Sequence, residues 1–266
     1  MTVNGAVPVA FERRAERAQF LAGKAAAGDP LRFAAGLYRV QGRLAATLEV
    51  LHPGRRQLTG RLAEDLTRLV EASGELLRFA AESGPVGLAS MARARSREAE
   101  SSLGSRLVTF WSADRATPDY LSRALLRPYV EVLARLGIAP DRPLQRGHCP
   151  FCGGAPWIAA RRSATEDDGT SRFLGCALCG REWPLARIRC PSCSEEDPER
   201  LPSFRSDTHA AVRIEACETC RRYVKSIDLT LEGGAIPEVD DLVSLGMDLW
   251  AANEGFERLE PGLAGI

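Results

Sequence analysis

The stretch from residue 149 to residue 220 opens with Cys149-Pro150-Phe151-Cys152 and goes on to Cys176-Ala177-Leu178-Cys179, Cys190-Pro191-Ser192-Cys193 and Cys217-Glu218-Thr219-Cys220. These four C-x-x-C pairs hold all eight cysteines of the 266-residue chain. A secreted disulfide framework would scatter its cysteines, and a reducing cytosol would not keep them oxidised. Clustered C-x-x-C pairs of this kind indicate metal binding.

The four pairs form an internal repeat. One constant shift takes Cys149 to Cys190 and Cys176 to Cys217, and the same shift takes Arg172 to Arg213. Each copy therefore reads C-P-x-C, an insert of matched length, and C-x-x-C. The matched inserts favour two similar modules that each hold their own metal ion. A cross-braced arrangement, in which alternate pairs share an ion, stays open at this point.

The spacing within each pair has a physical reason. A C-x-x-C turn aims two sulfurs at one point, and two facing turns supply four thiolates in a tetrahedron, with metal–sulfur distances of about 2.3 Å for zinc. Gly153 and Gly180 follow the second cysteine of their pairs and let the turn take a positive φ at low cost. Ser194 and Arg221 stand at these places in the second copy, so the turn geometry is less certain there.

The sequence predicts two metal ions per chain, each in a tetrathiolate site. Such sites suit zinc or a single iron, and ligand softness does not separate the two. His148 and His209 lie near the pairs, but four cysteines per module already complete the coordination. The predicted ligands are Cys149, Cys152, Cys176, Cys179, Cys190, Cys193, Cys217 and Cys220.

Short strands are expected around the cysteine pairs. Trp157, Ile158 and Phe173 in the first insert, and Val212 and Ile214 in the second, have the side chains that strands favour. Modules this small, which we place at 147–187 and 188–229, cannot bury enough apolar surface to fold without metal.

The part of the chain before the cysteines is expected to be helical. Apolar residues recur at helical spacing from Asp29-Pro30 to Leu51, over 62–77, and over 121–136. Thr117-Pro118 should begin the last of these helices and Gly137 should cap it, with Pro128 kinking or splitting it. We predict a helical domain over 1–140 and a linker over 139–143.

The end of the chain predicts one more helix. Pro237-Glu238-Val239-Asp240-Asp241 places acids at the positive end of a helix dipole, and Gly255 should end the helix. Apolar residues cover a wide arc of it, so we expect it to be well buried on the modules or on the helical domain. The predicted fold is therefore α+β: an all-α N-terminal domain, tandem rubredoxin-like or zinc-ribbon four-cysteine modules, and a C-terminal helix over 237–255.

Composition narrows the classes of function. The chain has 35 basic and 35 acidic residues, no apolar run long enough to span a bilayer and no secretory leader, so we expect a cytoplasmic protein without membrane insertion. No phosphate loop, H-E-x-x-H helix or nucleophile elbow occurs, so no enzyme is predicted.

Two alternative functions depend on the same cysteine pairs. A dithiol oxidoreductase would need one activated thiol in a thioredoxin-like setting, which the pattern does not show. A nucleic-acid-binding zinc ribbon would need a basic face. Acidic residues balance the arginines of this region, which we interpret as a solvated face or a protein-docking surface: Arg161, Arg162, Arg172, Arg187, Arg189, Arg221 and Arg222.

Taken together, these features resemble the FdhE family, the formate dehydrogenase accessory proteins of bacteria. The resemblance covers nearly the whole chain and is strongest from Cys149 to Leu249. Besides the four pairs, the residues that carry it include Gly153-Gly154-Ala155-Pro156, Glu182-Trp183, Tyr223-Val224-Lys225, Val239-Asp240-Asp241-Leu242, Phe11-Glu12-Arg13-Arg14 and Tyr120-Leu121-Ser122-Arg123.

The resemblance implies a cytosolic maturation factor rather than an enzyme. Such a factor would bind the catalytic subunit of respiratory formate dehydrogenase before its Tat-dependent export. Metal ligation carries over to all eight cysteines, because the four pairs match the family pattern residue by residue. A zinc-ribbon protein that binds nucleic acid is the alternative.

Overall fold

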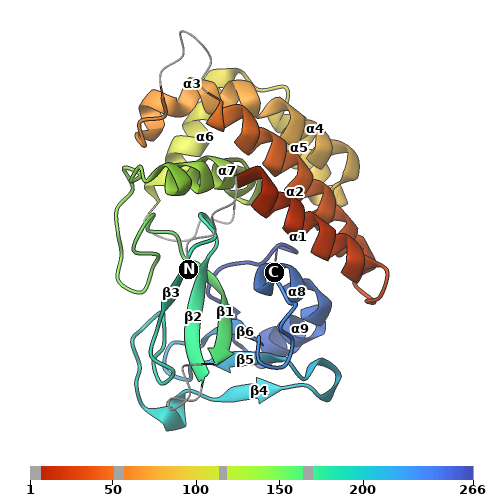
Figure 1. Ribbon diagram of the computed structural model, residues 1–266, viewed down its shortest axis with the longest axis vertical. Helices are drawn as coiled ribbons and strands as arrows, with labels where there is room; N and C mark the ends of the chain where they lie inside the picture. Colours follow the sequence, from red (N-terminus) through yellow and green to blue (C-terminus); the bar gives the residue numbers. More distant parts are fainter. Residues whose placement is uncertain (1–6, 51–56, 114–118, 164–169, 266) are drawn as a thin grey trace. The chain divides into compact units, whose positions relative to one another are not determined.

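The computed structural model describes residues 7–50, 57–113, 119–163 and 170–265. The chain forms two compact units. The helical unit comprises residues 1–19 and 32–143, and the sheet unit comprises residues 20–31 and 144–266. Figure 1 shows the helices of the N-terminal half and the strands that follow them. The α+β fold class predicted from the sequence is confirmed, and the domain boundaries stay a prediction.

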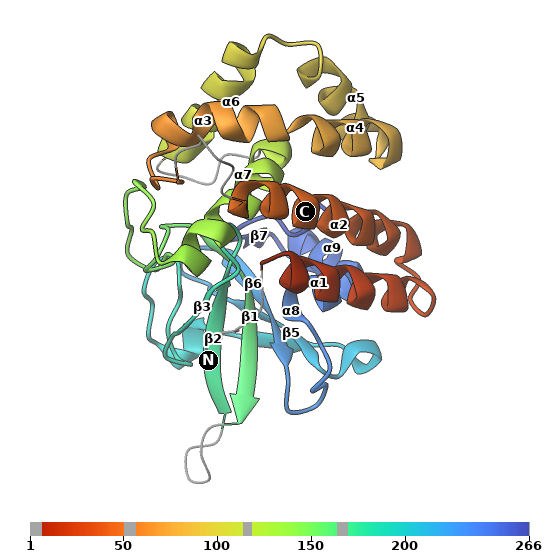
Figure 2. The same ribbon diagram turned by 45° about the horizontal axis from the view of Figure 1, so that its top comes forward.

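Seven helices make up the N-terminal half among the residues described, and Figure 2 shows them in a second view. In helix α7 every residue from Leu121 to Leu133 is buried. None of the described helices combines the length and hydropathy that crossing a membrane requires. The helices are α1 (Val7–Ala22), α2 (Gly28–Glu49), α3 (Leu62–Ala72), α4 (Gly74–Ser83), α5 (Val86–Arg95), α6 (Glu100–Ser112) and α7 (Tyr120–Leu136).

The expectation of helical spacing over 62–77 is corrected in one respect. The stripe over 62–77 is not one helix: α3 ends at Ala72, and α4 begins at Gly74. At the junction the buried Ser73 hydroxyl donates to the Val70 carbonyl at 2.6 Å, a local bond that competes with helix continuation. Gly137 caps α7 in the left-handed conformation as predicted, while Asp119 caps its start. The expected start at Thr117-Pro118 lies outside the described residues.

Pro128 does not split α7, which runs unbroken through it. Proline has no N–H, so the carbonyl of Ala124, four residues earlier, loses its helical donor. The buried side chain of Gln41, on α2, supplies the missing bond: its Nε2 donates to the Ala124 carbonyl at 2.8 Å. A partner distant in sequence thus stabilises the helix where local rules predict a break.

The two cysteine modules join into one sheet instead of forming separate small domains. Among the described residues the sheet has seven strands in the order β3-β2-β1-β6-β5-β4, with β7 beside β6. Neighbours within each module are antiparallel, whereas β1 and β6, which join the modules, are parallel. The strands are β1 (Pro156–Ser163), β2 (Thr170–Cys176), β3 (Glu182–Pro184), β4 (Ser203–Arg205), β5 (Val212–Ala216), β6 (Arg222–Asp228) and β7 (Glu257–Arg258).

The sequence repeat is visible in this topology. Strands β1, β2 and β3 of the first module correspond to β4, β5 and β6 of the second, and both sets follow the same order across the sheet. The pairing of β1 with β6 places the two copies in the same orientation, one beside the other. The starts of β1 and β6 and the ends of β2 and β5 therefore lie at the same edge of the sheet, and the cysteine pairs belong to this edge.

The C-terminal segment packs on one face of the sheet, and it is not the single helix expected. It is divided into α8 (Pro237–Asp240), a 3₁₀ turn (Asp241–Ser244) and α9 (Leu245–Asn253). Val239 and Leu242 are buried, but Leu249 is 59% exposed, so the expectation of burial holds for only part of the segment.

A buried group of charges fastens this segment to the sheet. The ammonium of Lys225, fully buried on β6, lies 2.9 Å from Asp241 and 2.6 Å from Asp248, and it also donates to the Asp241 carbonyl at 2.8 Å. Arg258, on β7, pairs with the same two carboxylates. Burial alone would raise the pKa of Asp241, but Arg258 and Lys225 hold it below its usual value. Asp241 thus stays charged beside these two cations, and the 3₁₀ turn forms where Lys225 meets the backbone.

The bond from Gln41 to Ala124 predicts a conditional effect on stability. Gln41→Met should destabilise the protein by about 1–3 kcal/mol, because it leaves a buried carbonyl without a donor. In a Pro128→Ala background the backbone N–H of residue 128 can donate instead, so the same substitution should cost much less. Urea unfolding of the four proteins of this double-mutant cycle measures the difference. Equal costs in both backgrounds would contradict the account.

Candidate metal centres

All four C-x-x-C turns have the same backbone geometry. In each turn the N–H of the first cysteine donates to the carbonyl five residues on, as from Cys149 to Gly154 at 2.9 Å and from Cys190 to Glu195 at 2.8 Å. The residue after the second cysteine donates back to the first, as from Gly153 to Cys149 at 2.9 Å. The repeat found in the sequence therefore extends to the individual hydrogen bonds of the turns.

The residue after each second cysteine has a positive φ: 65° at Gly153, 66° at Gly180, 64° at Ser194 and 56° at Arg221. The second module thus reaches the same turn without glycine, at a cost of roughly 1–2 kcal/mol for each non-glycine residue. The Arg221 guanidinium lies over the Phe256 ring at 3.8 Å and pairs with Glu218, contacts that offset part of this cost. Ser194 and Arg221 therefore form the same turn as Gly153 and Gly180.

The turns bring the eight sulfurs into two clusters, one in each module. In the first cluster Cys149 Sγ lies 3.6 Å from Cys179 Sγ, and Cys152 Sγ lies 3.4 Å from Cys176 Sγ. In the second, the separations are 3.7 Å between Cys190 and Cys220 and 3.6 Å between Cys193 and Cys217. Within each cluster all four sulfurs lie within 4.8 Å of one another. The arrangement within modules is observed, and the cross-braced alternative is excluded.

These separations fit a metal ion better than a disulfide. A disulfide would need sulfurs about 2.05 Å apart, and all eight cysteines are free. A tetrahedron with metal–sulfur distances of about 2.3 Å has sulfur–sulfur edges of about 3.8 Å, close to the separations observed. Gly154 keeps the first cluster open, since a Cβ there would lie 2.6 Å from Cys176 Sγ. Each cluster can therefore hold one metal ion.

Without a cation, four neighbouring thiols cannot all ionise. Burial raises the pKa of Cys176 and Cys190 above the usual thiol value. Hydrogen bonds from Cys152, Cys176 and Cys179 instead hold the pKa of Cys149 far below it. One thiolate is thus stabilised at the expense of its neighbours, whereas a bound divalent ion favours the ionised form of all four.

The two clusters differ in exposure. All four cysteines of the first are buried, with 4% exposure or less. In the second, Cys193 is exposed and Cys220 is partly exposed. Solvent therefore reaches the second cluster, and the first is closed off inside the sheet unit.

Other residues singled out from the sequence lie around the clusters. The His148 ring contacts the Gly153 carbonyl at 3.0 Å and lies outside both sulfur clusters, and His209 is part of a 3₁₀ turn (Asp207–His209). Arg172, expected on a solvated face, is buried and pairs with Glu215 at 2.7 Å. The ion pairs of Lys225 also escaped prediction, because their partners come from a distant segment.

The chain is similar to known proteins. A family model described as the FdhE central domain matches residues 148–187, and one described as the FdhE C-terminal domain matches residues 188–263. A curated FdhE homologue of Pseudomonas putida is 30% identical over 275 residues, covering 95% of this chain and 86% of the relative. The chain belongs to the FdhE family. Each of the two matched stretches of this chain contains one of its four-cysteine clusters.

Further members of the FdhE family agree with this assignment. Protein FdhE of Escherichia coli is 29% identical over 273 residues, covering 93% of this chain and 85% of that protein. An FdhE homologue of Aquifex aeolicus is 34% identical over 120 residues, 45% of this chain and 42% of the relative. The crystal structure of the FdhE protein from Pseudomonas aeruginosa superposes with a TM-score of 0.70 at 25% identity, over 96% of this chain and 95% of that one.

The left-handed turn at Ser194 predicts a stabilising substitution. Ser194→Gly should raise stability by about 1 kcal/mol, because glycine adopts a positive φ without the penalty of a Cβ. Ser192→Gly, two residues earlier in the same turn, is the matched control; its φ is not positive, so it should stabilise nothing. Thermal unfolding of both variants tests this. A gain at residue 192 equal to that at residue 194 would contradict the explanation.

Proposed function

We propose that the protein is a non-catalytic accessory factor that holds two metal ions and binds the catalytic subunit of a formate dehydrogenase during its maturation. The observation that carries the proposal is the pair of four-sulfur clusters at one edge of the sheet, in a chain of the FdhE family. Binding would take place in the cytoplasm, before Tat-dependent export of the subunit.

In this proposal all eight cysteines are metal ligands. Cys149, Cys152, Cys176 and Cys179 would hold one zinc or iron ion, and the second cluster would hold another. The ions would cross-link turns that lie at the ends of short strands, of which β3 and β4 have only three residues each. The role proposed for the metal is structural; iron would add one-electron redox chemistry at the solvent-exposed cluster.

The difference in exposure predicts two rates of metal release. A chromophoric chelator should remove the metal of the second cluster first, because Cys193 is open to solvent while the first cluster is buried. Absorbance of the chelator complex should show two phases. Cys193→Ser should abolish the fast phase and Cys152→Ser the slow one. Loss of the slow phase in the Cys193 variant, or of the fast phase in the Cys152 variant, would contradict the assignment.

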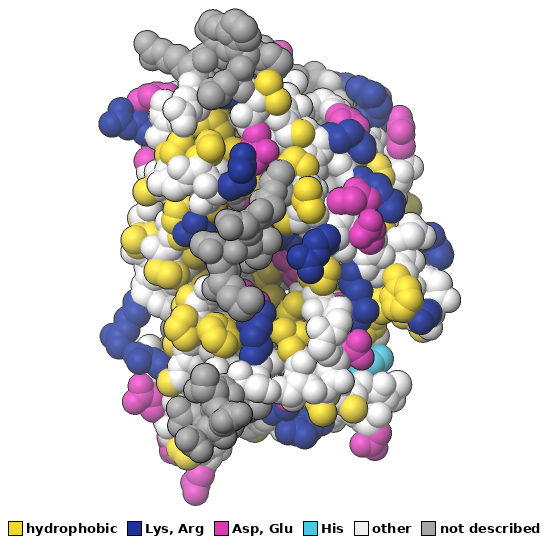
Figure 3. Space-filling view, in the orientation of Figure 1, with side chains coloured by type: hydrophobic (Ala, Val, Ile, Leu, Met, Phe, Trp, Pro, Cys, Tyr) yellow, Lys and Arg dark blue, Asp and Glu magenta, His cyan; other side chains and the backbone are white. Residues whose placement is uncertain are grey.

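The surface supports a protein partner over nucleic acid. On the face shown in Figure 3, Lys and Arg side chains are interspersed with Asp and Glu, and hydrophobic side chains lie among them. Binding to a phosphate backbone favours a continuous basic stripe. An interspersed surface of this kind suits a folded protein client better.

Retention of the client tests the proposed function. The full chain, loaded with metal and immobilised, should retain a formate dehydrogenase catalytic subunit that still carries its export signal, and nuclease treatment should leave this retention unchanged. A folded, exported protein of similar size is the control client. A variant with Cys152→Ser and Cys193→Ser should retain less, since each of the two clusters would lose one sulfur ligand.

Three other outcomes would overturn the proposal. Failure of the metal-loaded chain to retain the subunit would contradict the proposed binding of this client. Salt-sensitive retention of DNA or RNA in its place would support the zinc-ribbon alternative. Catalytic reduction of insulin disulfides by the metal-free chain would indicate a dithiol oxidoreductase.

A further inference from the structure

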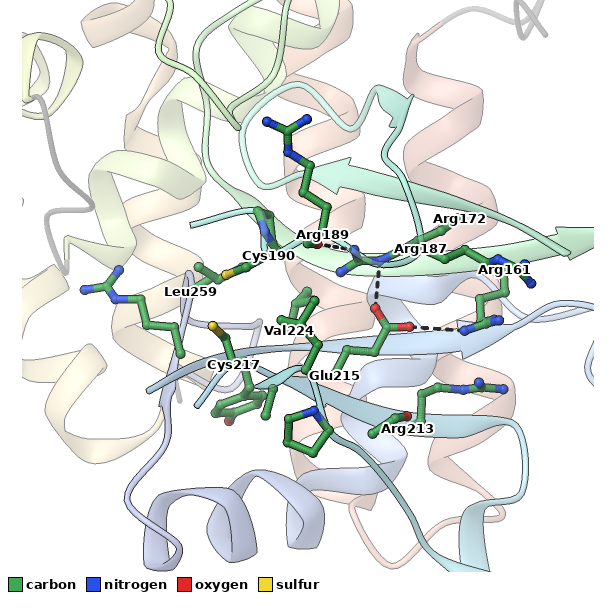
Figure 4. A pocket seen from close by; sticks show the side chains of 17 residues that line it. Arg161, Arg172, Arg187, Arg189, Cys190, Arg213, Glu215, Cys217, Val224 and Leu259 are labelled. Atoms are coloured by element: carbon green, nitrogen blue, oxygen red, sulfur yellow. Dashed lines mark hydrogen bonds and ion pairs between the residues drawn. The ribbon is translucent and has the colours of Figure 1, made fainter. Parts of the chain in front are cut away.

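A pocket lies on the face of the sheet opposite α8 and α9. Successive side chains of β6 point to opposite faces: Lys225 reaches the C-terminal segment, whereas Val224 lines the pocket. Residues of β1, β2, β5 and β6 form its floor, and the segments around residues 187–191 and 201–203 form its rim. Figure 4 shows the sulfurs of Cys190 and Cys217 close together at one end, away from Glu215 and the arginines around it.

The described residues that line this pocket include six arginines and a single acid, Glu215. The Glu215 carboxylate lies between two of them, 2.7 Å from Arg172 and 3.6 Å from Arg161 (Figure 4). Arg213 pairs with Asp228 at 2.9 Å. We call this cavity the arginine pocket; its arginines are Arg161, Arg172, Arg187, Arg189, Arg213 and Arg222.

Positive charge exceeds negative charge in the arginine pocket. Glu215 and Asp228 offset two of its six arginines, and a metal ion in the adjacent tetrathiolate cluster leaves about −2 there. Arg189 and Arg222 also pair with Glu196 and Glu257, but these acids are 65% and 76% exposed, so the pairs contribute little. Burial lowers the pKa of Arg213, and the charges of Arg161 and Arg205 lower it further, as expected where cations crowd.

Two arginines, Arg187 and Arg189, lie at the rim of the pocket. Arg187 is exposed and has no hydrogen-bond or ion-pair partner among the described residues. Arg189 precedes Cys190, and its own carbonyl accepts from Arg172 at 2.9 Å, which ties the rim to the floor. A guanidinium presents paired N–H donors that match the oxygens of a phosphate or carboxylate.

The size of the pocket limits its ligand. It encloses about 110 Å³, well below the roughly 300–1,000 Å³ of sites for drug-sized molecules. That space suits an ion of a few heavy atoms and is too small to enclose a nucleotide. We propose that the arginine pocket binds a small divalent oxyanion of the phosphate or sulfate type. The proposal rests on the geometry of residues 144–266 and is independent of the client proposed above.

The Glu215 carboxylate competes with a bound oxyanion for Arg161 and Arg172 in this proposal. The carboxylate occupies the position between Arg161 and Arg172 that an oxyanion would otherwise share. An entering dianion must bind beside this negative charge or displace it. Removing the charge without changing the shape, by Glu215→Gln, should therefore strengthen anion binding.

Titration calorimetry with inorganic phosphate tests the proposal on the full, metal-loaded chain at constant ionic strength. One site should be found, and acetate, a planar monoanion, should bind at least tenfold more weakly. Arg187→Gln with Arg189→Gln should weaken phosphate binding tenfold or more, and Glu215→Gln should tighten it severalfold. Arg162→Gln is the matched control: it removes the same charge from β1 on the opposite face, and phosphate affinity should be unchanged.

Other results would overturn the proposal. Equal heats with sodium chloride and with phosphate would indicate only a general attraction of anions. An equal loss of phosphate affinity in the Arg162 variant and in the Arg187/Arg189 variant would indicate the same. A nucleoside monophosphate that binds more than tenfold tighter than phosphate would show a larger site than the one inferred. Metal content and unfolding temperature, measured for each variant, separate loss of the ligand site from loss of the fold.

Discussion

The sheet unit depends on the closeness of four sulfurs in each of two clusters. Separations of 3.4–3.7 Å place thiols where they cannot all ionise by themselves. A divalent cation removes this conflict, and its binding free energy becomes folding free energy. The same constraint is consistent with the strained turns: Ser194 and Arg221 have a positive φ in a turn that aims both sulfurs of its pair at one point.

The clusters also determine what surrounds them. Parallel pairing of β1 with β6 puts both clusters at one edge of the sheet, where the strands begin or end. The buried charges of Lys225, Asp241, Asp248 and Arg258 fasten the C-terminal segment to one face. The arginine pocket lies on the opposite face, and the exposed cluster lies at one end of this pocket. The same edge of the sheet therefore carries one buried sulfur cluster and one that solvent reaches.

The repeat and the cysteine spacing were enough to predict two four-sulfur clusters, because a C-x-x-C turn is a local structure that aims both of its sulfurs at one point. Features that depend on distant partners escaped prediction. Pro128 was expected to kink or split its helix; the helix is not split, and Gln41, far away in sequence, satisfies the carbonyl that proline leaves unpaired. The helix expected from Pro237 to Gly255 is divided where the Lys225 ammonium reaches the backbone, a contact with no signal in the local pattern.

The metal content of the chain tests the central claim most directly. Protein purified without oxygen and without a chelating tag should contain two metal ions per chain, and its absorption spectrum distinguishes zinc, which is colourless, from iron bound by thiolates. Cys152→Ser should reduce the content to one. Fewer than one ion per chain in the unaltered protein would contradict the two-site account.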